Sequence, residues 1–216
     1  MEAINLYLGD CLEAMRAMPD KSYDLAIVDP PYGLGFSDYK RGGTDSVKRR
    51  HKAKSWDDQT PQDEYFEQLK RVAVNYIVWG GNYFTFLWRE PCQGFIYWHK
   101  GNPVPNFSDG ELAYTSFKKP AKQYDYRYYG GIEGKSTAGQ KIHPTQKPVQ
   151  LYEWLLDNYA ERGQTILDTH LGSGSIAIAC HNRGFSLDAW EIDPDYFASA
   201  TKRFIQHKAQ LTIWNP

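Results

Sequence analysis

The chain of 216 residues has the length of one domain, and a chain of this size buries about 70% of the surface that its unfolded form exposes. Its three cysteines, Cys11, Cys92 and Cys180, stand far apart and have no histidine at metal-ligand spacing, so the sequence predicts neither a disulfide framework nor a metal site. No run approaches the roughly 20 apolar residues of a membrane span, and the first residues lack the pattern of a secretion signal. We expect a protein of the reducing cytoplasm.

The net charge of −1 conceals an uneven distribution of basic residues. Residues 40–54 hold seven Lys or Arg against one Asp, residues 118–147 hold seven against two acidic residues, and the rest of the chain is acidic. Concentrated basic segments fit a partner with repeated negative charge, because each neutralised phosphate releases counterions. Such segments are also typical of solvated loops, so charge alone leaves both interpretations open.

Strands and helices alternate along the chain. The spacing of apolar residues predicts strands at residues 4–9, 23–28, 75–79, 94–98, 165–168 and 185–191. It predicts a helix that starts at Thr60 as N-cap with Pro61 in the first position, and further helices at 11–18, 148–159, 173–182 and 194–207. This alternation favours an α/β fold with a mostly parallel, twisted sheet and helices on both faces. Ligands bind such sheets at the carboxyl ends of the strands.

Two long stretches interrupt the alternation. Residues 33–59 are basic and rich in glycine, and residues 99–142 contain "GNPVPNFSDG" and the tyrosine-rich "QYDYRYYGG". Loops of this length in a compact domain are usually functional or disordered. We therefore expect them to carry binding functions around one α/β core.

A glycine turn in "ILDTHLGSGSIAIA" is a candidate cofactor site. An apolar strand ends at Asp168, Gly172 and Gly174 follow, and a helix then begins, so backbone can pass close to a ligand near unpaired helical N–H groups. A second strand ends at Glu191, whose carboxylate could accept hydrogen bonds from two ribose hydroxyls. The pattern also fits a nicotinamide dinucleotide enzyme or a plain turn, although too little chain follows for a second nucleotide-binding half.

The segment "DPPYG" at residues 29–33 follows the apolar run "YDLAIV". An amino group conjugated to an aromatic base is a poor nucleophile, and two acceptors on its N–H bonds would free its lone pair. The Asp29 carboxylate and the Pro30 carbonyl offer two such acceptors, and Pro30 and Pro31 add rigidity without a competing N–H. Tyr32 could stack on an extruded base. The alternative interpretation is an ordinary proline turn.

These motifs together resemble the S-adenosylmethionine-dependent DNA amino-methyltransferases that modify adenine N6 or cytosine N4. "DPPY" is similar to the family's catalytic motif, and "LDTHLGSGS" to its cofactor loop, usually "DPFxGSGT", with Thr169 and His170 in place of Pro and Phe. "GDCLEAM", "HPTQKP" and "WEIDPDYFASATKRF" match further family segments. The order, catalytic motif before cofactor loop, resembles the permuted β-type of this family. The resemblance implies a Rossmann-like methyltransferase fold in a single domain over residues 1–216.

The resemblance implies roles for individual residues. Asp29, Pro30, Pro31 and Tyr32 would handle the target base. The implied cofactor-binding residues are Asp10, Cys11, Asp29, His143, Lys147, Asp168, Gly172, Gly174, Glu191 and Ile192, with His143 and Lys147 near the cofactor carboxylate. DNA would be the partner, held by the basic loop around residues 33–59 through Lys40, Arg41, Lys48, Arg49, Arg50, Lys52 and Lys54.

The implied activity is adenine N6 methylation, because Asp-Pro-Pro-Tyr is the family's usual adenine form. Cytosine N4 in DNA, adenine in RNA, or a catalytically idle nucleic-acid-binding module of the same fold remain alternatives. A small target-recognition insert around residues 117–142 favours a short or relaxed recognition sequence. "PCQGF" at 91–95 resembles the nucleophile motif of cytosine C5 methyltransferases, but the acidic partner stretch of those enzymes is missing. The sequence leaves open whether the protein forms a homodimer and whether a cognate restriction endonuclease accompanies it.

Overall fold

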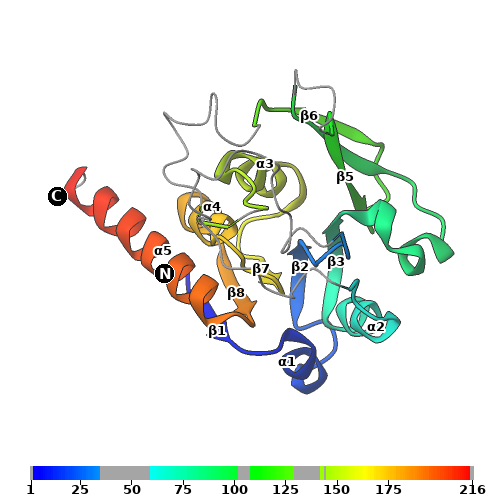
Figure 1. Ribbon diagram of the computed structural model, residues 1–216, viewed down its shortest axis with the longest axis horizontal. Coiled ribbons are helices and arrows are strands. Elements are labelled where there is room, and N and C mark those ends of the chain that lie inside the picture. Colours follow the sequence, from blue (N-terminus) through cyan, green and yellow to red (C-terminus); the bar gives the residue numbers. More distant parts are fainter. Residues whose placement is uncertain (1, 35–58, 102–107, 129–141, 144, 215–216) are drawn as a thin grey trace, which may run out of the picture.

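The computed structural model describes residues 2–34, 59–101, 108–128, 142–143 and 145–214. An eight-stranded sheet in the order β1-β8-β7-β2-β3-β5-β4-β6 forms the centre of the molecule (Figure 1). Its strands are β1 (Ile4–Leu8), β2 (Tyr23–Val28), β3 (Ala73–Trp79), β4 (Phe95–His99), β5 (Gly110–Thr115), β6 (Lys122–Asp125), β7 (Thr165–Asp168) and β8 (Ser186–Glu191). Every neighbouring pair is parallel except those that involve β5, which runs antiparallel to both β3 and β4.

Helices cover both faces of the sheet, as predicted. The helices α3 (Val149–Tyr159), α4 (Ser175–Arg183) and α5 (Pro194–Trp214) lie on one face, and α1 (Cys11–Ala17) and α2 (Asp63–Val72) lie on the other (Figure 1). Alternation along β2 explains the two layers: Leu25 and Ile27 belong to the core beneath α3 and α4, whereas Ala26 and Val28 belong to the core beneath α2. The predicted Rossmann-like α/β fold is therefore confirmed.

Each predicted strand is present within two residues of its expected bounds, but β5 and β6 lie inside the stretch that we expected to be a loop. The strand β6 has four residues, mostly exposed, at the edge of the sheet, so it shows no apolar alternation. The strand β5 gains its partners only through long-range pairing with β3 and β4. The described part of the expected recognition insert thus contributes an edge strand to the main sheet.

The predicted start of the helix at Thr60 is wrong. The helix begins at Asp63, after Gln62 as N-cap, and no side chain caps it. Thr60 instead lies beside Gly33, where its methyl group would be 3.3 Å from an added Cβ, so it packs against the loop that follows Tyr32. Asp63 and Glu64 occupy the first turn, where their negative charge is favourable to the helix dipole.

Some predictions fall outside the described residues. The basic segment 40–54, with all seven predicted nucleic-acid-binding residues from Lys40 to Lys54, lies there, and so does most of the expected loop 33–59. Among the helices that the structure describes, none is both long and apolar enough to cross a membrane.

Candidate functional site

Acidic side chains follow four neighbouring parallel strands at the carboxyl edge of the sheet. Asp10 follows β1, Glu191 ends β8, Asp168 ends β7 and Asp29 follows β2, which is the spatial order of these strands. A bond from the Gly9 N–H to the Glu191 carbonyl, 2.9 Å, joins the ends of the first two strands. Residues far apart in the sequence therefore share one edge, where α/β sheets bind their ligands.

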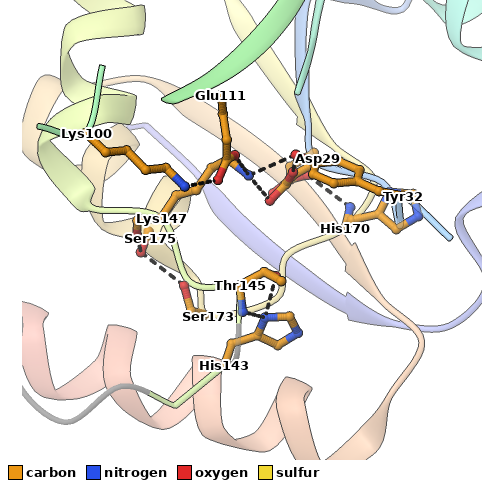
Figure 2. Close-up of polar contacts among 11 residues, drawn as sticks. Asp29, Tyr32, Lys100, Glu111, His143, Thr145, Lys147, His170, Ser173 and Ser175 are labelled. Carbon is orange, nitrogen blue, oxygen red and sulfur yellow. Dashed lines mark hydrogen bonds and ion pairs between the residues drawn. The ribbon is translucent and has the colours of Figure 1, made fainter. Parts of the chain in front are cut away.

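Asp29 is held by two donors (Figure 2). The Tyr32 hydroxyl donates to Oδ1 at 2.7 Å, and the Lys147 ammonium donates to Oδ2 at 2.5 Å. Lys147 also donates to the Tyr32 hydroxyl at 3.2 Å, which closes a triangle of three polar groups. The side chain of Lys147 is only 3% exposed, so its charge has to be matched by carboxylates nearby.

Glu111 supplies a second carboxylate to this cluster. Its Oε2 lies 3.1 Å from the Lys147 Nζ, and its Oε1 accepts a close hydrogen bond from Lys100 (Figure 2). Burial opposes the ionisation of Glu111, but Lys147 and Lys100 outweigh it and lower its pKa to about 2. Burial likewise opposes the charge on Lys147, whose pKa is nevertheless raised by Asp29 and Glu111. Both groups are therefore charged at neutral pH.

The ring of Tyr32 is positioned by the chain after β3. It stacks on Tyr83 with centroids 4.9 Å apart and packs edge-on against Phe84. Gly80 adopts a left-handed conformation with φ of +68°, and a Cβ at this position would lie 2.1 Å from the Tyr32 ring. Glycine is needed here for both the backbone conformation and the close approach of the ring.

The glycine turn lies beside His143. Gly172 donates to Glu191 Oε2 at 2.8 Å, and Asp193 donates to Oε1 at 2.9 Å, so both oxygens of Glu191 are fixed by backbone. Gly174, with φ of +72°, is the N-cap of α4. The ring of His143 is buried against Tyr196, and the atoms nearest to an added Cβ on Gly172 would belong to His143 and to the His170 carbonyl, at 3.8 Å or more. The His143 ring thus lies beside the turn, next to a carboxylate that backbone N–H groups hold in place.

Among the described residues, no cationic side chain bonds to Asp168. Its Oδ1 accepts from the His170 N–H at 2.9 Å, but burial, together with the negative charges of Asp29 and Glu191, raises its pKa to about 8. Burial also raises the pKa of Asp29, to which the charge of Glu111 adds and which Lys147 opposes. The edge of the sheet therefore has an excess of carboxylates and fits a ligand that carries positive charge.

Three more predicted residues lie near this edge. Asp10 is the N-cap of α1 and accepts from the Leu12 N–H at 2.7 Å. Cys11 is half-buried, and burial beside Asp10 raises its pKa to about 12, so its thiol stays protonated. Ile192 is 63% exposed and directly follows Glu191.

The two departures from the usual family loop form a polar contact of their own. Thr169 Oγ1 lies 2.7 Å from the Tyr65 hydroxyl of α2 and 2.8 Å from His170 Nδ1. The His170 ring packs edge-on against Tyr65, and burial lowers its pKa to about 4. A neutral imidazole therefore occupies the aromatic position of the loop.

Comparisons with known proteins agree with this geometry. The model of the N6/N4 DNA methylase family matches residues 113–202, which include Lys147, the glycine turn and Glu191. A type II methyltransferase of Haemophilus parainfluenzae, M.HpaI, is 24% identical over 92% of this chain and 73% of its own length. The family model and this relative support an N6-adenine/N4-cytosine DNA methyltransferase.

Solved structures share the fold of this methylase. The M1.HpyAVI–SAM complex superposes with a TM-score of 0.60 and 21% identity over 93% of this chain and 99% of that protein. The PvuII DNA methyltransferase, which is cytosine-N4-specific, superposes with a TM-score of 0.63 and 16% identity over 100% of this chain and 92% of that protein. A cytosine-N4-specific enzyme thus shares this fold, and the fold does not choose between adenine and cytosine.

The structure brings the predicted residues of the two motifs to one edge, where the ammonium of Lys147 bonds to Asp29. The sequence did not predict this ion pair. Sequence reasoning missed Glu111, Lys100 and Gly80. Charged residues beside a predicted loop gave no sign of burial, whereas the glycine pair in "WGGN" directly after a strand was an available signal of close packing.

Cys92 lies at the opposite edge of the sheet. Cys92 precedes β4, and β4 runs parallel to β2 and β3. Cys92 therefore lies at the amino ends of these strands, whereas Asp29 lies at the carboxyl end of β2. Its thiol donates to the Gly94 carbonyl at 2.7 Å, and it lines a cavity of about 360 Å³ with Tyr76 and Tyr114. The methylase therefore does not bring Cys92 to the carboxylate edge.

We predict that the pH dependence of stability will reveal the raised pKa of Asp168. The raised pKa means that the folded protein binds this proton up to about pH 8, whereas the unfolded chain loses it near pH 4. Asp168 therefore costs no stability at pH 4 and progressively more as the pH rises to 8. Asp168→Asn, which keeps the acceptor for His170, should gain stability over the wild type across this range. Urea unfolding of both proteins between pH 5 and 8 measures the difference, and a constant difference would contradict the prediction.

We predict that Gly80→Ala will abolish most methyl transfer by displacing Tyr32, since the added Cβ would lie 2.1 Å from the ring. Gly163→Ala is the matched control, because Gly163 also has positive φ, +87°, but its Cβ would meet nothing within 4 Å. Both variants pay a backbone cost of about 1–2 kcal/mol, measurable by urea unfolding. Only Gly80→Ala should lose activity, and equal activity in the two variants would contradict this role of Gly80.

Proposed function

We propose that the protein transfers the methyl group of S-adenosylmethionine to the N6 amino group of adenine in DNA. The match of residues 113–202 to the DNA methylase family model supports the reaction class and the DNA substrate. The observation that carries the proposal is the position of Asp29, which lies beside Tyr32 at the carboxyl edge, one strand away from Asp168 and the glycine turn. A reactive carboxylate, an aromatic ring and a cofactor turn thus meet at the same edge.

The cofactor is S-adenosylmethionine, which supplies an activated methyl group on a positively charged sulfur. The residues at the edge fit this cation, because Glu191 and Asp29 are carboxylates and because a positive charge beside the buried Asp168 would favour its ionised form. Glu191 would accept hydrogen bonds from the ribose, and the exposed face of Ile192 would cover the adenine. Gly172 and His143, which lie side by side, would border the methionine end.

Asp29 and the Pro30 carbonyl would each accept one N–H of the target amino group. This arrangement frees the nitrogen lone pair, which forms the new N–C bond as the bond from methyl carbon to sulfur breaks. The methylated nitrogen then carries one proton too many, and Asp29, with its raised pKa, is placed to accept it. Orientation of amino group and methyl donor contributes most, an effect worth roughly 7–11 kcal/mol in well-aligned reactions.

Adenine is favoured over cytosine by the aspartate in "DPPY", the form that resembles the adenine enzymes of the family. Cytosine N4 is the second candidate, because the PvuII enzyme of the same fold is cytosine-N4-specific.

We further propose that residues 1–216 form a single domain, that the basic segment 40–54 contacts DNA phosphates, and that the recognition sequence is short or relaxed. The small insert near residues 117–142, part of which is the edge strand β6, supports the last point.

The decisive experiment incubates the protein with DNA and S-adenosylmethionine labelled in its methyl group and identifies the modified nucleoside by mass spectrometry. We expect N6-methyladenine from the wild type and a loss of activity in Asp29→Ala, because the acceptor of the amino proton is removed. Cys92→Ser is the control that should retain activity, since Cys92 lies at the opposite edge. N4-methylcytosine would select the second candidate, and 5-methylcytosine or an active Asp29→Ala protein would overturn the mechanism.

A further inference from the structure

The buried ammonium of Lys147 lies between two carboxylates. It bonds to Asp29 Oδ2 at 2.5 Å and stands 3.1 Å from Glu111 Oε2 (Figure 2). Within the described part of the chain, Glu111 Oε2 has no hydrogen-bond partner, so this contact is a charge contact without hydrogen-bond alignment. The ammonium is thus aligned on Asp29 while a second acceptor stands within its reach.

In this arrangement both oxygens of Asp29 already accept a hydrogen bond, from Tyr32 and from Lys147. A target amino group that donates to Asp29 has to compete with these donors. If the ammonium loosens its bond to Asp29, it needs another acceptor, because an unpaired charge in this buried position would cost several kcal/mol. Glu111 Oε2 is the nearest acceptor that is not yet in use.

We infer that Glu111 is a positioning residue for the reaction: it takes over the Lys147 ammonium when the target amino group binds to Asp29. The inference rests on the proposed function. Glu111 never touches the base in this scheme; it acts through Lys147, which shifts by a small distance from one carboxylate to the other. Asp29 then keeps its negative charge and gains room to accept the amino N–H.

The surroundings of Glu111 suit this role. Lys100 holds its other oxygen, Oε1, and stands over the Trp98 ring at 4.8 Å. The side chains of Asp29, Lys147, Glu111 and Lys100 form one row of two carboxylates and two ammonium groups, in which each ammonium contacts a carboxylate. A shift of Lys147 along this row changes no net charge. It strengthens the ion pair with Glu111 as the one with Asp29 weakens, which costs far less than leaving the ammonium unpaired.

The antiparallel direction of β5 places Glu111 at the carboxyl edge of the sheet. In a parallel strand, the first residues lie at the edge opposite the site. Because β5 runs antiparallel to β3, with Ala113 opposite Trp79, Glu111 lies two residues beyond the end of β3 on the carboxyl side. The negative charge of Glu111 therefore enters the site from a strand that contributes nothing to the two sequence motifs.

Kinetics test the inference with Glu111→Gln and Glu111→Asp. We expect kcat to fall by roughly 100-fold in Glu111→Gln, with the KM for S-adenosylmethionine unchanged, because misplacement of Asp29 affects the reaction and not cofactor binding. Glu111→Asp should retain more activity than Glu111→Gln, since it keeps the charge. The reverse order, in which the nearly isosteric glutamine is better, would indicate a packing role and overturn the inference. Glu64→Gln, which removes an exposed ion pair with Arg16, is the control and should be unaffected.

A second measurement does not depend on methyl transfer. NMR of ¹⁵N-labelled lysine side chains, with Lys147 assigned through Lys147→Arg, follows the ionisation of this ammonium. The variant Asp29→Asn imitates an Asp29 that is occupied by the target amino group, and in it Lys147 should stay charged because it pairs with Glu111. In the double variant Asp29→Asn/Glu111→Gln both carboxylates are gone, so burial acts unopposed and the pKa of Lys147 should fall. An equal pKa in the two proteins would overturn the inference. Absence of methyl transfer by the wild type would refute the proposed function instead.

Discussion

The ion pair between Asp29 and Lys147 is the constraint on which the site depends. A carboxylate in this largely buried position would be neutral if it stood alone, and a neutral carboxyl group would be a weaker acceptor for an amino proton. Lys147 opposes that loss of charge from 118 positions further along the chain. The same ammonium could not stay charged without carboxylates, so each group maintains the other in the state that the chemistry needs.

This mutual dependence explains the arrangement of the whole carboxyl edge. Parallel strands bring Asp10, Glu191, Asp168 and Asp29 into one row, and β5 adds Glu111 from the opposite direction. At one end of the row, Lys147 forms an ion pair with Asp29 and Lys100 forms one with Glu111. At the other end Asp168 keeps a raised pKa, because the backbone N–H of His170 compensates burial only in part. The uncompensated end is the one that would receive a cationic cofactor, so charge balance separates the cofactor half of the site from the base half.

Much of this architecture could be predicted from the sequence, and the failures have a common cause. The strands β2, β3 and β7 were predictable because burial on both faces or alternation leaves a local pattern, and the motifs at their ends were recognisable. The strands β5 and β6 were missed because long-range pairing, and not local pattern, determines them. Glu111 and Lys100 were missed with them, since each looks like a solvated charge until β4 and β5 are paired. Lys147 was assigned to the site, but its ion pair with Asp29 was not predicted, because its backbone position did not reveal how far its side chain reaches.

The orientation of the base-binding groups also depends on residues that lie outside the sequence motifs. "DPPY" brings Tyr32 close to Asp29, but the angle of its ring is set by Tyr83 and by the space above Gly80, both in the chain after β3. The hydroxyl of Tyr32 in turn donates to Asp29, so the ring that would contact a base and the carboxylate that would accept its proton are coupled. A short motif can therefore specify the reacting groups, whereas their orientation and charge depend on β3, on β5 and on Lys147. The residues that orient the reacting groups thus lie outside the motif, and the fold that carries them is shared with a cytosine-N4-specific enzyme.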